Sequence, residues 1–402
     1  MSILIALAGL GLLIFVHELG HFTASLAVGL RPRRFYIGFP PAIAKTTRNG
    51  IEYGIGAIPL GGFVKIPGMH RPTVGDVDQH FGPAAAEAPE LAGPLDRLRR
   101  GLTDDDLGSA RAALEEIAGR RDSLTLSPVA LRGFDRGIGD LGDALGPEAY
   151  WRAATWRRLA AIAAGPGANV ALALVLLTIL FLSGGGRATT TVDTVVANTP
   201  AKAIGLEAGD EILAVNGVPV HASQISERIN ASKGAPVRLT VERDGNRVVL
   251  GPVRPRLQEG RYRIGFALAG EGLGFGESVW QSVRVTGLVT KEIGASLGRL
   301  VTGEGRDEIS SPVGITQAGS EAVQQGTDNF LWVLALISLS LALLNMLPLL
   351  PLDGGHVVFA LIEGARGGRS VRREVYERVS AVGIVFVVLL FVIGLSNDIG
   401  RL

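Results

Sequence analysis

Three residues that can bind a metal and move protons lie together near the start of the chain, in the run His17-Glu18-Leu19-Gly20-His21. On a helix, imidazoles four residues apart share one face and can bind one zinc ion. A carboxylate beside them can act as a general base toward water. The spacing therefore predicts a hydrolytic zinc site with His17 and His21 as ligands and Glu18 as the base.

The setting of this run strengthens the prediction. Between Ser2 and Leu30 the only ionisable residues are these three. A segment of roughly 20 apolar residues is long enough to cross a bilayer. A carboxylate at bilayer depth costs about 2.5 kcal/mol or more, so ionisable residues there usually serve a function. This favours a metal site over a chance match to the pattern.

A catalytic zinc ion usually has three protein ligands and one open position, so a third ligand is required. The chain has no Cys, which leaves His and carboxylates as candidates. The segment 345–356 follows an apolar run and contains Pro348 and Pro351, which break a helix. Unwound backbone at membrane depth is tolerated where it lines a protein cavity. We therefore predict Asp353, in this segment, as the third ligand.

The elements that must position these residues are helices, because four runs of the chain are apolar enough to cross a bilayer. We predict transmembrane helices over residues 1–30, 159–182, 329–356 and 379–396. Basic residues cluster after the first run, before the second, and between the third and fourth. Because such clusters favour the cytoplasmic side, we expect both termini to be extracytoplasmic.

The formal net charge of +1 gives no indication of nucleic-acid binding.

The segment between the first two predicted helices divides into two parts. Residues 31–69 are expected to form a membrane-associated β-hairpin region on the cytoplasmic side, with a short hairpin over 54–65, where apolar residues alternate with Gly. A strand edge there could pair with an extended peptide, and an ordinary surface hairpin is the alternative. Residues 70–158 contain no chemical motif, and we expect a cytoplasmic insertion that is helical or partly disordered.

Residues 188–268 are expected to form a separate α/β domain outside the cytoplasm. Apolar residues alternate over four short segments, which predicts strands, and the run from Gly205 to Gly217 is similar to the PDZ signature. PDZ domains bind peptide ends by adding a strand to a sheet edge, and a purely structural spacer is the alternative. Residues 269–328 are expected to be an amphipathic linker on the same side of the membrane.

Taken together, these motifs resemble the site-2 proteases, intramembrane zinc metalloproteases that cut transmembrane segments of regulatory proteins. Besides the runs 17–21 and 353–355, the resemblance rests on Gly54 to Lys65, Gly165 to Asn169 and Ser311 to Ile315, in this order along the chain. It implies a multi-pass α-helical membrane protein with four transmembrane helices, a membrane-associated β-hairpin and an extracytoplasmic α/β PDZ domain.

The resemblance also implies roles for single residues. His17, His21 and Asp353 would bind Zn²⁺, and Glu18 would activate the attacking water. Asn345 would lie near the cleft and hold the substrate backbone or the developing oxyanion.

The hairpin would bind the substrate as an extended strand through Gly54, Ile55 and Gly56. The implied substrates are single-span membrane proteins such as anti-sigma factors, cut in a bacterial inner membrane after a first extracytoplasmic cleavage. Peptide ends or substrate domains would bind at the PDZ domain.

Some features depart from the family pattern, and two other functions stay open. Leu350 occupies a position where the family usually has Pro, and the Pro follows at 351. The first alternative function is a membrane scaffold that presents the PDZ domain without proteolysis. The second is a membrane-anchored zinc protease of soluble or damaged proteins, for which Glu363 or Glu374 would have to be the third ligand.

Overall fold

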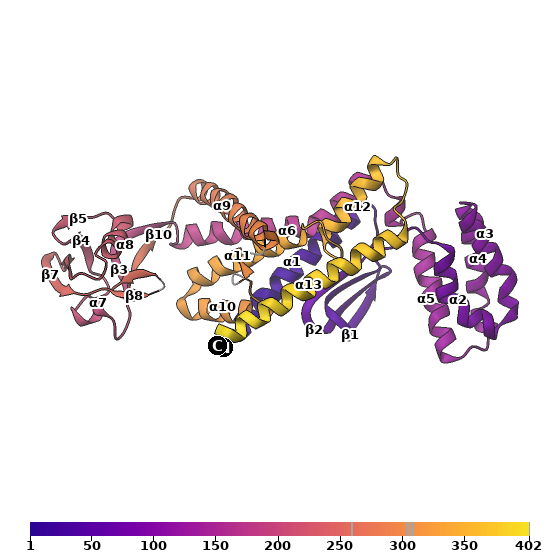
Figure 1. The fold of residues 1–402 in the computed structure, drawn as a ribbon, viewed down its shortest axis with the longest axis horizontal. Helices are drawn as coiled ribbons and strands as arrows, with labels where there is room; N and C mark the ends of the chain where they lie inside the picture. Colours follow the sequence, from indigo (N-terminus) through magenta and orange to yellow (C-terminus); the bar gives the residue numbers. More distant parts are fainter. Residues whose placement is uncertain (259, 303–304, 307–308, 402) are drawn as a thin grey trace. The chain divides into compact units, whose positions relative to one another are not determined.

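The computed structural model describes residues 1–258, 260–302, 305–306 and 309–401, so small parts of the predicted segments 188–268 and 269–328 lie outside the described residues. The chain divides into two compact units. One comprises Met1–Leu172, Val289–Gln324 and Leu336–Leu402, and the other comprises Ala173–Leu288 and Gln325–Ala335. Figure 1 shows the course of the chain through its helices and strands.

Four helices of the described chain are long and apolar enough to cross a membrane, as the four apolar runs predict. They are α1 (Ser2–Ala27), α6 (Thr155–Ser183), α11 (Thr327–Asn345) and α13 (Arg373–Arg401). Helices α1 and α6 approach closely at Gly20, where an added Cβ would lie 2.8 Å from the Cβ of Ala168. Small residues allow such close helix packing in membranes.

The third predicted span, 329–356, is wrong in its second half, because α11 ends at Asn345 and a separate helix, α12 (Asp353–Ala365), begins at Asp353. Pro348 and Pro351 lie in the connecting loop, where they cannot continue a helix. The loop packs back on the start of α12, because an added Cβ on Gly355 would lie 2.6 Å from the backbone nitrogen of Leu350. Asp353 thus lies in a first helical turn, where the helix dipole favours a carboxylate.

The β-region is a long ribbon of β1 (Arg34–Arg48) and β2 (Ile51–Lys65). The predicted hairpin over 54–65 is wrong, because this run is most of one strand. The hairpin turn lies earlier, at Asn49-Gly50, where both residues have positive φ angles, 51° and 77°. Asn-Gly is a strong signal for a two-residue hairpin turn.

The ribbon curls so that the first part of β1 lies between two parts of β2. Residues 34–37 pair with 52–55 on one side and with 62–65 on the other. Backbone hydrogen bonds continue this arrangement at Arg33, which donates to Lys65 O at 2.7 Å and accepts from Glu52 N at 3.0 Å. Residues 62–65 therefore form an edge of the ribbon in the described part of the chain.

The insertion between the ribbon and α6 is helical. Its helices are α2 (Val74–Glu87), α3 (Ala92–Thr103), α4 (Leu107–Gly119) and α5 (Pro128–Leu145). They bury a common apolar core in which the rings of Phe81 and Phe134 meet edge to face. Two ion pairs join α5 to the ribbon region: Arg33 Nε to Asp143 Oδ1 at 2.7 Å and Lys65 Nζ to Asp140 Oδ1 at 2.8 Å.

The other unit contains a small domain with a mainly antiparallel sheet of order β10-β3-β4-β6-β7, with β5 beside β4. Its strands are β3 (Arg187–Val195), β4 (Glu211–Val215), β5 (Val218–Pro219), β6 (Val237–Arg243), β7 (Asn246–Val253) and β10 (Phe266–Glu271). The short pair β8 (Arg256–Gln258) and β9 (Arg261–Arg263) and the helices α7 (Pro200–Ala203) and α8 (Ala222–Ala231) complete it.

An ion pair with a buried carboxylate stabilises the turn of this domain that precedes β4. Asp210 is 1% exposed and accepts a hydrogen bond from Arg243 Nε at 2.6 Å. Burial raises the pKa of Asp210, but the bonds from Arg243 and from the backbone of Glu207 lower it more, so its pKa lies below the usual value. The carboxylate is therefore charged at neutral pH.

Two further helices follow this domain along the chain and precede α11, namely α9 (Phe275–Thr302) and α10 (Pro312–Gln325). Asp398 of α13 accepts hydrogen bonds from the backbone nitrogens of Ser311 at 2.8 Å and Gly314 at 3.0 Å. A carboxylate at this position satisfies free N–H groups at the start of α10. The Ser-Pro-Val-Gly run is thus the segment through which α10 is held to α13.

Candidate metal centre

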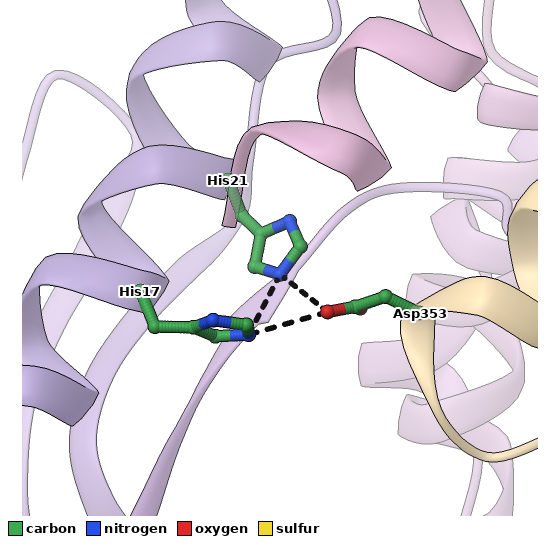
Figure 2. A group of neighbouring side chains, drawn as sticks. All are labelled: His17, His21 and Asp353. Atoms are coloured by element: carbon green, nitrogen blue, oxygen red, sulfur yellow. Dashed lines mark hydrogen bonds and ion pairs between the residues drawn. The ribbon is translucent and has the colours of Figure 1, made fainter. Parts of the chain in front are cut away.

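Three potential ligand atoms converge in the unit that contains α1 and α12 (Figure 2). The Nε2 atoms of His17 and His21 are 3.2 Å apart, and Asp353 Oδ2 lies 3.2 Å from the first and 3.3 Å from the second. The two histidines come from α1 and the aspartate from the start of α12. The structure therefore brings together all three residues predicted as ligands.

The geometry of these three atoms fits a zinc ion. Zinc ligands at 2.0–2.1 Å in a tetrahedral arrangement are about 3.3 Å from one another, close to the separations measured here. Asp353 Oδ2 is buried, and among the described residues no hydrogen bond of acceptable geometry reaches it. Three potential ligand atoms thus converge on one place. Nitrogen and carboxylate oxygen are suitable donors for zinc.

Helix α6 contacts both imidazoles at their Nδ1 atoms. His21 Nδ1 lies 3.0 Å from the carbonyl oxygen of Ala161, and His17 Nδ1 lies 3.4 Å from Nδ2 of Asn169. These contacts engage the Nδ1 atoms and leave both Nε2 atoms for a metal, an arrangement common at zinc sites. Sequence reasoning assigned no role to Asn169, although a buried amide within an apolar span is a signal of function.

Glu18, the predicted base, lines the cavity that contains the three ligand atoms. The ribbon reaches this side chain at Gly62, where an added Cβ would lie 2.8 Å from Glu18 Cγ. The edge of β2 therefore approaches the carboxylate more closely than any residue with a side chain would allow. Sequence reasoning missed Gly62, because only the tertiary contact distinguishes it from the other glycines of the run.

Asn345 also reaches the centre. It is the last residue of α11, lines the cavity, and places its Nδ2 atom 3.5 Å from His17 Nε2. An amide at this distance has N–H groups available for a molecule bound at the metal.

The structure does not bring the predicted substrate contacts Gly54, Ile55 and Gly56 to the cavity of the three ligand atoms. They lie between residues of β1 on both sides, because Gly54 pairs with Tyr36 and Lys45, and neither they nor their immediate neighbours are among the described residues that line the cavity. The part of β2 that lines the cavity is 61–65. The curl of the ribbon accounts for this difference, since residues 52–55 of β2 pair with β1 on both sides, whereas residues 62–65 pair with it on one side only.

The cavity has a volume of about 980 Å³ and extends from the three ligand atoms to the helical insertion. Its far wall includes Asp140 and Asp143 of α5 and His80 of α2. His356, one turn after Asp353, lines it as well and contacts the hydroxyl of Tyr376 at 3.3 Å. The insertion, for which the sequence suggested no role, thus forms part of the wall of the candidate site.

A buried ion pair fixes α12 against α6. Arg158 and Glu363 are only 6% and 7% exposed, and the guanidinium donates to the Glu363 carboxylate. Glu363 also accepts a hydrogen bond from the backbone nitrogen of Val371 at 2.8 Å. The ring of Tyr150 lies 5.0 Å from the guanidinium carbon. Both oxygens of Glu363 are therefore engaged away from the three ligand atoms.

Comparison with known proteins agrees with this arrangement. The model of Peptidase family M50 matches residues 5–390. A putative zinc metalloprotease of Agrobacterium fabrum is 31% identical over 98% of this chain and 94% of its own length. The zinc metalloprotease RasP of Geobacillus kaustophilus is 29% identical over 100% and 98% of the two chains.

A third relative is named for a regulatory role. The regulator of sigma-W protease RasP of Bacillus subtilis is 29% identical over 98% of this chain and 96% of its own length. The matches extend over nearly the full length of both partners. This chain belongs to Peptidase family M50, the site-2 protease family of zinc metalloproteases.

Proposed function

We propose that this protein hydrolyses peptide bonds within the transmembrane segments of single-span regulatory proteins, with His17, His21 and Asp353 as zinc ligands and Glu18 as general base. The observation that carries the proposal is the convergence of three ligand atoms within 3.3 Å of one another, on helices that belong to or follow apolar spans. A zinc site at that depth acts on peptide bonds that water does not otherwise reach.

The residues of the cavity divide the chemistry among them. When bound, zinc polarises the scissile carbonyl and makes a water molecule more acidic. The Glu18 carboxylate accepts a proton from the attacking water and later donates it to the nitrogen of the leaving amine. The Asn345 amide donates a hydrogen bond to the substrate carbonyl oxygen, where negative charge develops. Each peptide bond cleaved thus consumes one water molecule.

The edge of β2 over residues 62–65 binds the substrate as an added strand. A peptide bond within a helix is shielded and already hydrogen-bonded, so the substrate has to be extended before attack. Addition to a strand edge holds a chain in that form through backbone hydrogen bonds. The closeness of Gly62 to Glu18 supports this, because a strand added there lies beside the base.

The position in the membrane and the partners follow from charge and from the relatives. Basic clusters on one side of the apolar helices favour a bacterial cell membrane protein with both termini extracytoplasmic. The Bacillus subtilis relative is named as a regulator of sigma-W, which supports anti-sigma-type substrates. The small domain over 188–268 acts as a PDZ domain that binds peptide ends or substrate domains outside the cytoplasm.

The catalytic assignment is tested by Glu18→Gln in the purified full-length protein, with a single-span anti-sigma-type reporter as substrate. Loss of the base should reduce cleavage by about 10²-fold or more, while the zinc content per chain stays that of the wild type. Glu227→Gln, on an exposed position of α8, is the matched control and should cleave normally. Cleavage by Glu18→Gln at the wild-type rate would refute the assignment.

The PDZ assignment has its own test. Because the domain lies outside and would meet the extracytoplasmic part of a substrate first, we expect it to exclude substrates that have not been trimmed. Deletion of residues 188–268 should allow cleavage of a reporter that still carries a folded outer domain, measured against the same reporter after trimming. An unchanged requirement for trimming would contradict this role.

The two alternative functions have less support. A pure scaffold has no need for a carboxylate beside two histidines in an apolar helix. A protease with a glutamate as third ligand would need Glu363 or Glu374, but Glu363 is paired with Arg158 and Glu374 is exposed.

A further inference from the structure

Asn169 is the buried polar side chain nearest to the metal centre that has no role so far. It is fully buried on α6, and its Nδ2 atom faces Nδ1 of His17 at 3.4 Å. Its Oδ1 atom is also buried, and no hydrogen bond reaches it from the described residues. Ser338 of α11 donates to the backbone oxygen of Asn169 at 2.8 Å, which fixes the position of this residue in the bundle.

The tautomer of His17 explains how Asn169 Oδ1 can obtain a hydrogen-bond partner. An imidazole that binds a metal through Nε2 carries its proton on Nδ1, which then acts as a donor. An amide N–H pointing at this donor would make no bond. A half-turn of the amide exchanges its two ends, so that Oδ1 accepts from His17 Nδ1–H and no longer lies unpaired. A buried carbonyl without a hydrogen-bond partner is destabilising, which favours the turned amide once His17 has this tautomer.

We propose that Asn169 is a positioning residue for His17, whose Nδ1–H it holds so that the Nε2 lone pair points to the metal. The proposal rests on the metal site assigned above. The carbonyl of Ala161 does the same for His21, at 3.0 Å from Nδ1. One helix, α6, thus sets the tautomer and the ring orientation of both imidazoles. The contact to His21 comes from a backbone carbonyl, whereas the contact to His17 comes from the Asn169 side chain, which a substitution can remove.

The test measures zinc affinity of the full-length protein in detergent by competition with a chelating indicator. Loss of an outer partner of a ligating histidine weakens metal binding about 10- to 100-fold. We expect this loss for Asn169→Leu and for Asn169→Ala, which removes the amide without adding bulk. Asn169→Asp keeps an acceptor oxygen and should bind zinc within a few-fold of the wild type. Thr178→Val, which removes a hydroxyl from another turn of α6, is the matched control.

The visible spectrum of the cobalt-substituted protein gives a second readout, because it reports ligand geometry directly. It should change in Asn169→Leu and return toward the wild type in Asn169→Asp, a rescue that a merely structural role would not produce. His17→Ala calibrates the loss of a ligand. Wild-type affinity and spectrum in both Asn169→Leu and Asn169→Ala would overturn the role of Asn169 and leave the metal site intact. Equal, weak zinc binding by the wild type and His17→Ala would overturn the proposed metal site itself.

Discussion

Two glycines determine how closely backbone approaches the reactive side chains. At Gly62 an added Cβ would lie 2.8 Å from Glu18 Cγ, and at Gly165 it would overlap the ring of His21. Real Cβ atoms do not approach so closely, so a larger residue at either position has to displace Glu18 or His21. These positions are therefore sensitive although neither residue carries a functional group.

Gly62→Ala tests this closeness. The added methyl group should move Glu18 or the strand edge, and a shift of about 1 Å in a reacting group can reduce the rate by about 10²-fold. We expect a reduced kcat with unchanged zinc content, measured by cleavage of a single-span reporter and by metal analysis. Gly11→Ala on α1 is the control, because an added Cβ there meets nothing within 4 Å. Equal kcat for the two variants would show that Gly62 has no such constraint.

At the scale of elements, α6 is the helix on which the centre is assembled. It contacts His17 through Asn169 and His21 through the carbonyl of Ala161, and its Arg158 holds α12, the helix that carries Asp353. The two ligand-bearing helices therefore take their positions from a third helix, which contributes no ligand. The Arg158–Glu363 pair holds α12, and therefore Asp353 at its start, against α6.

Glu363→Leu should destabilise the protein strongly, because it leaves a buried guanidinium without its partner. Removing one member of a buried ion pair costs about 3–5 kcal/mol, whereas replacing both by apolar residues is often neutral. The double variant Arg158→Met with Glu363→Leu should therefore be more stable than the single variant. Thermal unfolding in detergent measures both. A double variant no more stable than the single one would argue against a paired role.

Local pattern was enough to predict much of the fold. Apolar runs indicated the four long helices, and alternation near Ile212 and Val237 indicated strands that the structure contains as β4 and β6. The predicted hairpin is misplaced because the Gly-rich run 54–65 lies within one strand, whereas the turn is formed by Asn49-Gly50. Pro348 and Pro351 predicted a break in the third apolar run, but the exact end of α11 at Asn345 was not predicted, because apolar residues continue beyond it.

The candidate site shows the same division between local and tertiary information. His17 and His21 were predicted as ligands because helical spacing alone places them on one face, and Asp353 because a third ligand was required and its loop follows an apolar run. Asn169 and Gly62 depend on how α6 and β2 pass the histidine helix. Contacts between elements so distant in the sequence cannot be obtained from one chain without the fold.

At the scale of the molecule, a bound zinc ion would join the first helix of the chain to α12, which begins at residue 353. An ion that binds only the folded state stabilises it in proportion to the logarithm of its concentration over Kd. The metal should therefore contribute to the stability of the whole helical unit as well as to catalysis.

Removal of zinc by a chelator should accordingly lower the unfolding temperature. Free zinc at 100 times Kd stabilises a folded protein by about 2.7 kcal/mol, which corresponds to a difference of roughly 5–11 °C at 2–4 °C per kcal/mol. Differential scanning fluorimetry of the protein with and without chelator measures this. His17→Ala should unfold at one temperature under both conditions. A wild type whose unfolding temperature is also unchanged by the chelator would contradict a structural contribution of the metal.

On the proposed function, the edge of β2 over residues 62–65 has a consequence for which proteins are cut. A strand edge presents only main-chain N–H and C=O groups, and these are the same in every sequence. Such an edge distinguishes an extended chain from a helical one and has little selectivity for side chains. The choice among membrane segments then depends on how easily each loses its helix, so that glycine and proline in a substrate's span, rather than a recognition motif, would decide its fate.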